Sequence, residues 1–285
     1  MQTIKLREML NQPGIIRAPG AFDAWSAKLV QMSGFPAVYM TGYGASASVL
    51  GAPDIGLMSM TEMATHAKNM VSAVQIPLIA DGDTGYGGVL NVIRTVREYE
   101  RGGVAAIQIE DQVLPKRCGH MEGKELVSKK EMVSKVKAAV YAKRSEDFII
   151  IARTDARAVN GFDDAMERAL AYREAEADII FFEAPQSVEE MKKVATSIKA
   201  PLLANMVEAG KTPFLTSAEL EKLGYKLVIY PSSTLYAATK SMMNVLQCLK
   251  ETDSTQEYLD KMVGFKDFYN LVGVEETRSL EKSFQ

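Results

Sequence analysis

Two stretches of the sequence place acidic residues directly after apolar runs and beside glycine-rich or basic loops. Asp81 and Asp83 follow the first run, and Glu110 and Asp111 follow the second. Carboxylate oxygens delivered by neighbouring strands can hold a hard divalent cation, partly through water. These residues therefore predict a cation site where the two runs end.

A single thiol follows the second acidic stretch. Cys118 lies in the loop Lys-Arg-Cys-Gly-His, which spans residues 116–120. The basic neighbours Lys116, Arg117 and His120 can lower the pKa of a thiol, which favours proton transfer or nucleophilic chemistry. The loop is therefore the candidate source of a catalytic group beside the cation.

The composition is that of a globular protein. Of the 285 residues, 47% are hydrophobic and 24% are charged, and the formal net charge of −3 gives no reason to expect a nucleic-acid partner. Two cysteines do not make a disulfide framework, which predicts a reducing compartment such as the cytoplasm. We find no signal-peptide core and no apolar stretch long enough for a bilayer, so we expect no membrane partner.

Eight short apolar runs alternate with helix-like segments. Strands covered on both faces read as continuous apolar runs, and this alternation is typical of an α/β fold, the (β/α)8 TIM barrel. The alternative is an open doubly wound sheet, but no Gly-x-Gly-x-x-Gly follows the first run. The predicted strands are Ile15–Ala18, Ala37–Met40, Ile76–Ala80, Val104–Ile109, Phe148–Ala152, Ala177–Phe182, Pro201–Ala204 and Lys226–Tyr230.

Helix-end signals support the intervening helices. Gly102-Gly103 is typical of a helix C-terminus, and Ser187 and Ser217 precede acidic residues as N-caps do. The clearest predicted helices are Met60–Val74, Val89–Arg101, Lys130–Arg144, Phe162–Glu174 and Ser187–Ile198. We expect one domain over residues 1–285, with a helical tail at about 237–285 that packs on a partner subunit.

Polar residues follow seven of the eight runs. In a barrel the chemistry sits where strands end and loops begin, so these side chains are expected to meet at one mouth. They are Thr41, Asp81, Asp83, Glu110, Arg153, Glu183, Asn205 and Ser232.

The chain resembles the phosphoenolpyruvate mutase/isocitrate lyase superfamily over nearly its whole length. The Lys-Arg-Cys-Gly-His loop resembles that of the carbon–carbon lyase branch, whereas branches that act on carbon–phosphorus bonds lack this cysteine. The matching stretches are Gly20-Ala-Phe-Asp23, Thr41-Gly42, Pro53-Asp54, Asp81-Gly-Asp-Thr-Gly-Tyr-Gly87, Glu110-Asp-Gln112, Lys116-Arg-Cys-Gly-His120, Arg153-Thr-Asp155 and Glu183-Ala184.

The resemblance implies a cofactor and an assembly. Asp81 and Asp83 would hold Mg²⁺ or Mn²⁺, with Asp54 and Glu110 reaching the ion through water. Related barrels exchange their last helix between subunits and form dimers of dimers, which implies a homotetramer here.

The resemblance also assigns the reacting groups. Arg153 would bind the oxygen that becomes the enolate, and Cys118 would protonate the departing carbanion. Tyr39 would assist removal of the hydroxyl proton. The remaining groups would cradle the oxo-acid carboxylate (Thr41, Gly42, Tyr43), place and tune the thiol on a lid (Lys116, Arg117, Gly119, His120), or meet the far end of a substrate (Glu183, Asn205).

The expected substrate is a small 2-hydroxy acid with two or three carboxylates, cleaved to pyruvate and a second carboxylate. The branch that cleaves 2-methylisocitrate carries arginines where Tyr236 and Phe265 align here, and its pocket is more polar than Asn205-Met206-Val207. Because arginine is the usual bidentate partner of a carboxylate, their loss favours a dicarboxylate with methyl groups. We predict 2,3-dimethylmalate, cleaved to pyruvate and propionate.

Other readings stay open. Cleavage of 2-methylisocitrate remains possible if Arg157 or Arg278 supplies the clamp, as do hydrolysis or decarboxylation of oxaloacetate. A non-catalytic oxo-acid-binding protein would retain the fold, although the intact acids and Cys118 argue against it. Cys248 and His66 are expected to be structural, and Lys124 is expected to lie on a solvated surface with its acidic neighbours.

Overall fold

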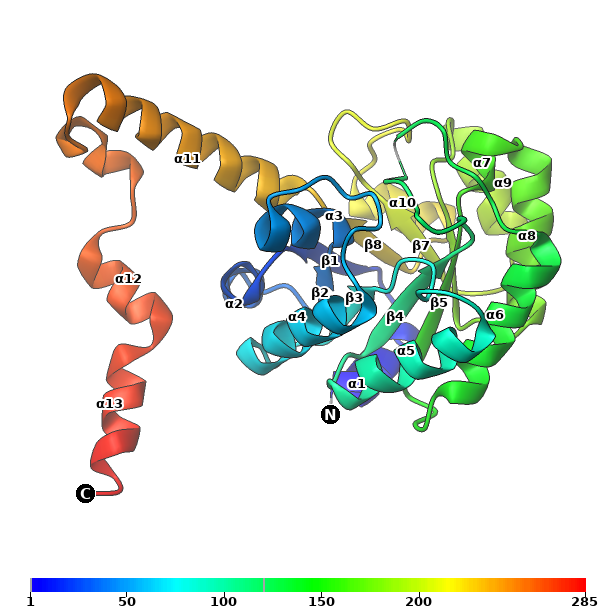
Figure 1. Cartoon of the computed structure of the whole chain (residues 1–285), viewed down its shortest axis with the longest axis horizontal. Helices are drawn as coiled ribbons and strands as arrows, with labels where there is room; N and C mark the ends of the chain where they lie inside the picture. Colours follow the sequence, from blue (N-terminus) through cyan, green and yellow to red (C-terminus); the bar gives the residue numbers. More distant parts are fainter. Residues whose placement is uncertain (1, 120) are drawn as a thin grey trace. The chain divides into compact units, whose positions relative to one another are not determined.

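The computed structural model describes residues 2–119 and 121–285 (Figure 1). Its chain divides into two units, the first ending at Leu235 and the second comprising Tyr236–Gln285. The first unit holds the strands and the residues expected at the mouth, and the second is helical. Each unit is described by itself.

The first unit is a closed barrel of eight parallel strands in sequential order. The predicted TIM barrel is confirmed, and all eight apolar runs form strands whose ends shift by only a few residues. The open-sheet alternative is wrong, because β1 pairs with β8 and closes the barrel. The strands are β1 (Ile16–Ala21), β2 (Val38–Met40), β3 (Leu78–Asp81), β4 (Ala106–Glu110), β5 (Ile149–Thr154), β6 (Ile179–Phe182), β7 (Leu202–Asn205) and β8 (Leu227–Tyr230).

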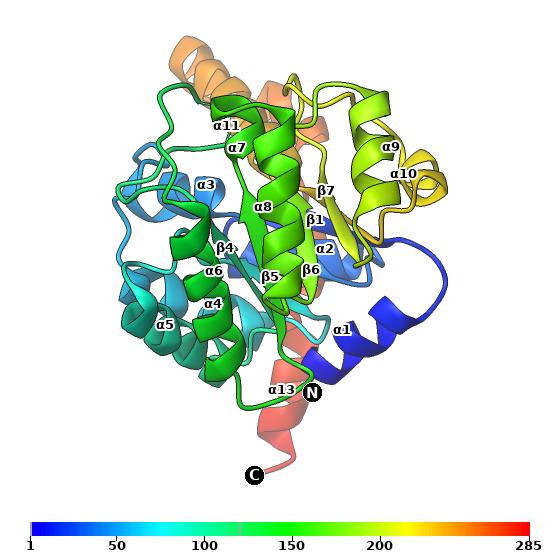
Figure 2. The same ribbon diagram turned by 90° about the vertical axis from the view of Figure 1, so that its right-hand side faces the viewer.

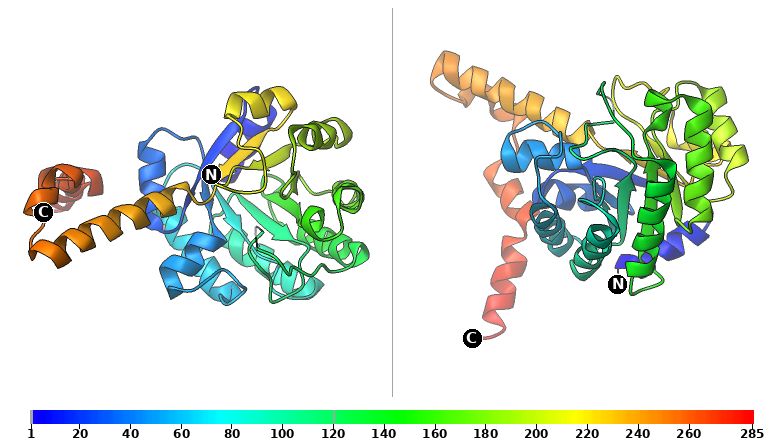
Figure 3. Two further views of the ribbon diagram at one scale, coloured as in Figure 1. Left: turned by 90° about the horizontal axis from the view of Figure 1, so that it is seen from above. Right: turned by 45° about the vertical axis from the view of Figure 1, so that its right-hand side comes forward.

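Helices surround these strands (Figures 2 and 3). The first unit contains α1 (Gln2–Asn11), α2 (Ala24–Met32), α3 (Gly42–Ala45), a π-turn (Ser46–Leu50), α4 (Met60–Ala73), α5 (Val89–Arg101), α6 (Lys129–Ala142), α7 (Ala156–Val159), α8 (Phe162–Glu174), α9 (Val188–Ser197), α10 (Ser217–Leu223) and the start of α11 (Ser233–Thr252). The second unit continues α11 and adds a 3₁₀ turn (Gln256–Lys261), α12 (Phe265–Val272) and α13 (Val274–Lys282). No helix in the described ranges has the length and apolarity to span a bilayer.

Two predicted helix starts have different outcomes. The hydroxyl of Ser187 accepts the N–H of Glu190 at 3.1 Å and caps α9, as predicted. The prediction for Ser217 is wrong, because Thr216 caps α10 and Ser217 is its first residue. Thr216 and Glu219 have the Thr-x-x-Glu spacing of a capping box, and each side chain binds the backbone N–H of the other.

Strand alternation decides which side chains face the barrel interior. Successive residues of a strand point to opposite faces, so Ile149 and Ile151 in β5 join the interior cluster whereas Ile150 joins the cluster under the helices. Arg153 follows the inward parity of β5. The amino ends of the strands are covered by α1, whose Leu6 packs into the interior cluster. The opposite, carboxyl ends carry the polar residues.

The second unit exposes many apolar side chains. Within α11–α13 no residue is buried, and Phe265 is 83% exposed while its ring lies 5.4 Å from that of Tyr269. Apolar helices of this kind usually need a covering surface. The expectation that residues 237–285 pack on a partner subunit stays a prediction.

Candidate active site

The carboxyl ends of three neighbouring strands each carry one of the predicted mouth residues. Asp81 ends β3, Glu110 ends β4, and Arg153 lies near the end of β5, where Glu110 and Arg153 are register partners. All three side chains are buried. These side chains point to the barrel interior, and the strands that carry them are parallel. Charged residues that are far apart in the sequence therefore meet at one end of the barrel.

Lys116 joins two of the predicted cation-binding acids. Its Nζ lies 2.6 Å from Oδ1 of Asp54 and 2.8 Å from Oδ1 of Asp83, and the lysine is only 3% exposed. Burial opposes the charged lysine, but the carboxylates of Asp83, Glu110 and Asp54 raise the pKa of Lys116 well above its usual value. The ammonium of Lys116 therefore offsets part of the negative charge of Asp54 and Asp83.

A hydrogen-bond chain positions Asp81. The hydroxyl of Tyr39 donates to Gln108 Oε1 at 3.1 Å, and the Gln108 amide donates to Asp81 Oδ1 at 3.4 Å. Burial and the nearby Asp81 raise the pKa of Tyr39 well above its usual value. A neutral phenol donates this hydrogen bond and orients Gln108, while the predicted part of Tyr39 in removing the hydroxyl proton stays a prediction. A Cβ on Gly42 would lie 2.6 Å from Asp81 Oδ2, so glycine is required at this close approach.

The donor set fits a hydrated divalent cation. Among the described residues, no three acidic, histidine or cysteine side chains form a preassembled metal cage. Mg²⁺ suits such a site, because it keeps several waters and usually takes only one or two carboxylates. Burial raises the pKa of Asp83 to about 6 against the opposing charge of Lys116, and Glu110 Oε1 has no hydrogen-bond partner in the described chain. These buried oxygens favour a further positive charge.

Arg153 is held by three acids. Its Nε and one terminal nitrogen donate to both oxygens of Asp155, at 2.9 and 3.0 Å. The Nε atom also lies 3.4 Å from Glu110 Oε2 and 3.9 Å from Glu183 Oε2, and the guanidinium stands 5.1 Å from the ring of Phe181. The planar head therefore has a fixed orientation at the centre of the mouth.

The loop with the predicted thiol lies against this arginine. A Cβ built on Gly119 would approach the Arg153 guanidinium to 2.2 Å and the Glu183 carboxyl carbon to 3.2 Å. Cys118 is half-buried. Only a residue without a side chain can pack here, so Gly119 lets the backbone beside Cys118 approach the charged cluster.

Asp111 faces the opposite way from Glu110. Its carboxylate accepts the N–H of Asp155 at 2.9 Å and the hydroxyls of Thr154 and Tyr172, both at 2.7 Å. Arg168 completes this buried group at 3.3 Å. Adjacent acids thus serve different sides of β4, and Asp111 supports the segment that carries Asp155 rather than lining the mouth.

The predicted substrate-end residues separate into two groups. The Asn205 amide donates to Glu183 at 3.2 Å, while its own oxygen has no hydrogen-bond partner in the described chain. Met206 instead packs in the core under the helices, and its sulfur accepts the N–H of Leu215 at 3.3 Å. Val207 is only half-buried. The Met206 side chain is therefore directed into the core under the helices and not toward the barrel interior.

The oxo-acid cradle also differs in detail. The N–H of Thr41 donates to the carbonyl of Ala21 at 3.2 Å, and the Thr41 hydroxyl caps α3 by accepting the N–H of Gly44 at 3.3 Å. The backbone N–H of Thr41 is thus occupied by the barrel. Gly42 and Tyr43 lie in the first turn of α3, and their part in the cradle stays a prediction.

For three predicted site residues the structure gives no place at the cluster. His120 lies outside the described residues. Tyr236 belongs to the second unit, so its place relative to the mouth is not defined. Arg117 is exposed, and its guanidinium donates to the carbonyl of Glu122 within the loop at 3.4 Å.

Two site residues were missed. Lys124 was expected on a solvated surface, and this is wrong: it is 7% exposed, and its Nζ lies 3.1 Å from Asp155 Oδ1. Although burial opposes it, the charges of Arg153 and Lys124 hold the pKa of Asp155 at about 2. The signal for Asp155 was present in its position two residues after Arg153. No sequence pattern near Lys124 indicates that the loop folds back on the barrel and buries this residue.

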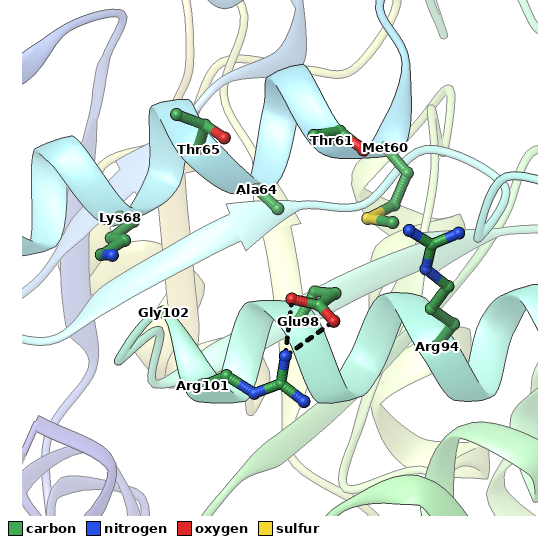
Figure 4. A pocket seen from close by; sticks show the side chains of 9 residues that line it. All are labelled: Met60, Thr61, Ala64, Thr65, Lys68, Arg94, Glu98, Arg101 and Gly102. Atoms are coloured by element: carbon green, nitrogen blue, oxygen red, sulfur yellow. Dashed lines mark hydrogen bonds and ion pairs between the residues drawn. The ribbon is translucent and has the colours of Figure 1, made fainter.

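A separate surface pocket lies between α4 and α5 (Figure 4). Lys68, Arg94 and Arg101 line it, and Arg101 is paired with Glu98 at 2.8 Å. None of the predicted site residues lines this pocket. His66, on α4, binds the carbonyl of Phe22 at 2.8 Å, in keeping with a structural role.

The sequence has extensive similarity to known proteins. Residues 6–250 match the family described as phosphoenolpyruvate phosphomutase. The chain is 55% identical over 280 residues to 2,3-dimethylmalate lyase of Eubacterium barkeri, which covers 98% of this chain and 97% of the relative. It is 48% identical over 268 residues to 2-methylisocitrate lyase of Aeropyrum pernix, which covers 94% of this chain and 86% of the relative.

Solved structures agree with the barrel over its full length. A 2,3-dimethylmalate lyase described as a PEP mutase/isocitrate lyase superfamily member matches with a TM-score of 0.94 at 38% identity, covering 99% of this chain and 95% of that one. A phosphonopyruvate hydrolase in complex with oxalate and Mg²⁺ matches with a TM-score of 0.89 at 31% identity, covering 99% and 98%.

Proposed function

Because this chain belongs to the phosphoenolpyruvate mutase/isocitrate lyase superfamily, as one of its carbon–carbon lyases, we propose that it cleaves 2,3-dimethylmalate to pyruvate and propionate. The relative of 55% identity that acts on this compound supports the choice of substrate. The observation that carries the chemistry is the packing of Gly119 on Arg153, because it brings the Cys118 loop to the charged mouth.

The proposed reaction breaks the bond between C2 and C3 of the substrate. The 2-hydroxyl gives its proton to a water molecule in the mouth, C2 becomes the carbonyl carbon of pyruvate, and the electron pair of the broken C2–C3 bond passes to C3 beside the second carboxylate. The Arg153 guanidinium binds the oxygen on which enolate charge develops, and the thiol of Cys118 delivers a proton to C3 to give propionate. Fixed donors aimed at developing charge lower the barrier in a closed site.

Mg²⁺ or Mn²⁺ would be held by Asp81 and Asp83, with Asp54 and Glu110 reaching it through water. When bound, the ion would supply Lewis-acid polarisation of the substrate oxygens. Lys116 keeps the acids ion-paired and carries the loop toward them. Tyr39, as a neutral phenol, orients Gln108 and through it Asp81.

The arginines of the chain favour a dicarboxylate. A third carboxylate would need a further clamp, and Arg157 is already bound to Glu190 at 2.7 Å and to Gln186 at 3.2 Å. Arg278, in the second unit, pairs with Glu275 at 3.2 Å and with Tyr269. Arg157 and Arg278, the two candidate clamps for a third carboxylate, therefore already have other partners. Tyr236 is kept as a proposed wall of the pocket.

The substrate prediction is tested by pyruvate release. With lactate dehydrogenase as coupling enzyme and excess Mg²⁺, we expect kcat/KM for 2,3-dimethylmalate to exceed that for 2-methylisocitrate by at least about tenfold, the equivalent of one lost ion-pair clamp. Preference for 2-methylisocitrate would overturn the dicarboxylate argument. Turnover of oxaloacetate alone would indicate a hydrolase or decarboxylase, and turnover of none would support a binding protein.

Metal removal tests the cation proposal. Dialysis against EDTA should abolish pyruvate release, and Mg²⁺ or Mn²⁺ should restore it. Asp81→Asn should raise the Mg²⁺ concentration at half-maximal rate at least about tenfold, because a carboxylate ligand is lost. Asp163→Asn is the matched control, since Asp163 is exposed on α8. Full activity of wild type in EDTA would contradict the proposal.

The assembly is also proposed as a homotetramer of helix-exchanged dimers, acting in the cytoplasm. The exposed apolar residues of the second unit, including Met242, Leu246 and Phe284, support an intersubunit role for it. Light scattering measures the mass: a tetramer is expected, and a monomer at micromolar concentration would refute this assembly.

A further inference from the structure

Lys124 lies on the return path of the loop that carries Cys118. The base of this loop is closed by an antiparallel bridge between Gln112 and Leu126, and the N–H of Val113 donates to the carbonyl of Glu125 at 2.8 Å. The Gln112 amide also binds the N–H and the carbonyl of Arg117, at 2.9 and 2.8 Å. Hydrogen bonds thus fix the segment from Gln112 to Arg117 and the point where the two ends of the loop meet.

Lys124 fixes the loop beside the thiol. Its ammonium donates to the backbone carbonyl of Gly119 and to Asp155 Oδ1, and the side chain is almost completely buried. Asp155 uses the same carboxylate to orient Arg153 and is itself held by the Asp111 group through its backbone N–H. One buried carboxylate therefore connects the loop backbone next to Cys118 with the guanidinium expected to bind the substrate.

We propose that Lys124 is a positioning residue that holds the Cys118–Gly119 segment over Arg153 by bridging the Gly119 carbonyl to Asp155. The proposal rests on the proposed lyase function for its consequence in catalysis, but not for the bridge. Lys116 anchors the loop to Asp54 and Asp83 on one side of the thiol, and Lys124 anchors it to Asp155 on the other. Two buried ammonium groups thereby fix the position of the thiol.

Burying the Lys124 ammonium costs free energy unless the charge is paired. The contact with Asp155 supplies this pairing, so Lys124 keeps the loop closed as long as the contact persists. Methionine has a similar length but no charge, so Lys124→Met removes the bridge and leaves Asp155 bound to Arg153. The loop should then open more often while the barrel remains folded.

Thiol alkylation tests the bridge without depending on turnover. Iodoacetamide is added to the full-length protein with Mg²⁺ and no substrate, and peptide mass analysis gives the rates at Cys118 and Cys248. Cys248, in the second unit, serves as the internal reference. We expect Lys124→Met to raise the ratio of the Cys118 rate to the Cys248 rate about tenfold or more, and Lys124→Arg to restore part of the protection.

Matched controls separate positioning from general destabilisation. Lys129→Met alters an exposed lysine at the start of α6 and should leave the ratio unchanged. Asp155→Asn should raise the ratio, and the double variant with Lys124→Met should raise it no further than the larger single effect. If Lys124→Met does not fold, Lys124→Gln gives the same reading. An unchanged ratio in the folded variant would overturn the proposal.

The catalytic consequence is measured separately. If the protein releases pyruvate from 2,3-dimethylmalate, Lys124→Met should lower kcat at least about tenfold with a smaller change in KM, because the lysine acts through the loop. A changed alkylation ratio without pyruvate release from wild type would retain the bridge and reject the proposed substrate. Pyruvate release by wild type with an unchanged alkylation ratio in Lys124→Met would retain the proposed substrate and reject the bridge.

Discussion

Replacing Cys118 by alanine is expected to lower kcat for 2,3-dimethylmalate by about 10²–10⁴-fold, the usual contribution of a positioned acid. The departing carbon needs a proton at C3, and free thiols, with a pKa of about 8.5, are mostly protonated at pH 7. The loop that carries Cys118 packs against Arg153, which places this donor beside the developing enolate. The measurement is single-turnover pyruvate formation with Mg²⁺ present.

Isotope exchange identifies the proton that Cys118 transfers. Propionate is incubated in D₂O with pyruvate and Mg²⁺. Wild type should introduce deuterium at C2 of propionate, and Cys118→Ala should not. Cys248→Ala is the matched control, because this cysteine lies in α11 and its replacement should leave the rates of exchange and of pyruvate formation unchanged. Exchange at the wild-type rate in Cys118→Ala would remove the thiol from the proposed mechanism.

Substituting lysine for Arg153 should reduce kcat/KM by about 10²–10³-fold, the cost of losing one preorganised donor at a developing negative charge. Lysine keeps the positive charge, but it cannot donate to both oxygens of Asp155 and still present nitrogen atoms to Glu110, Glu183 and a substrate. The expected loss is therefore greater in activity than in stability.

The comparison with methionine separates these two effects. Arg153→Met leaves Asp155, Glu110 and Glu183 without their shared cation, and removing one partner of a buried ion pair costs about 3–5 kcal/mol. Urea unfolding should thus show a much larger loss of stability for Arg153→Met than for Arg153→Lys. Arg157→Lys changes a similar bidentate pair with Glu190 outside the proposed site and should leave activity within about twofold. Equal activity of Arg153→Lys and wild type would exclude Arg153 from the reaction.

The barrel and much of its mouth could be read from local sequence patterns. Continuous apolar runs predicted all eight strands, because strands buried on both faces need apolar residues at every position. Asp81, Glu110 and Arg153 were recognisable as polar residues at the ends of such runs. The helix Val89–Arg101 was predicted with its observed bounds, since its stripe of apolar residues and its terminal glycines are local features.

The cap of α10 has a local signal, because Thr216 and Glu219 have the spacing of a capping box, yet the prediction named Ser217. Two other features could not be read locally. Asn205 ends β7 and Met206 follows it, yet the Met206 side chain enters the core, because alternate residues face opposite sides of the barrel. Lys124 looks like any surface lysine in a charged stretch, and only the folded loop reveals its buried contact with Asp155.

The sequence by itself determined the barrel, the family and the types of group available to the chemistry, because each depends on residues close in the chain or on their order. Only the tertiary structure decided that Glu110 faces the mouth while Asp111 supports Asp155, and that Lys116 and Lys124 fix the loop on both sides of Cys118. The physical reason is that charge pairing and burial depend on distance in space. The loop returns to the barrel and so brings together charged residues that are far apart in the sequence. Their separation along the chain does not indicate that they are in contact.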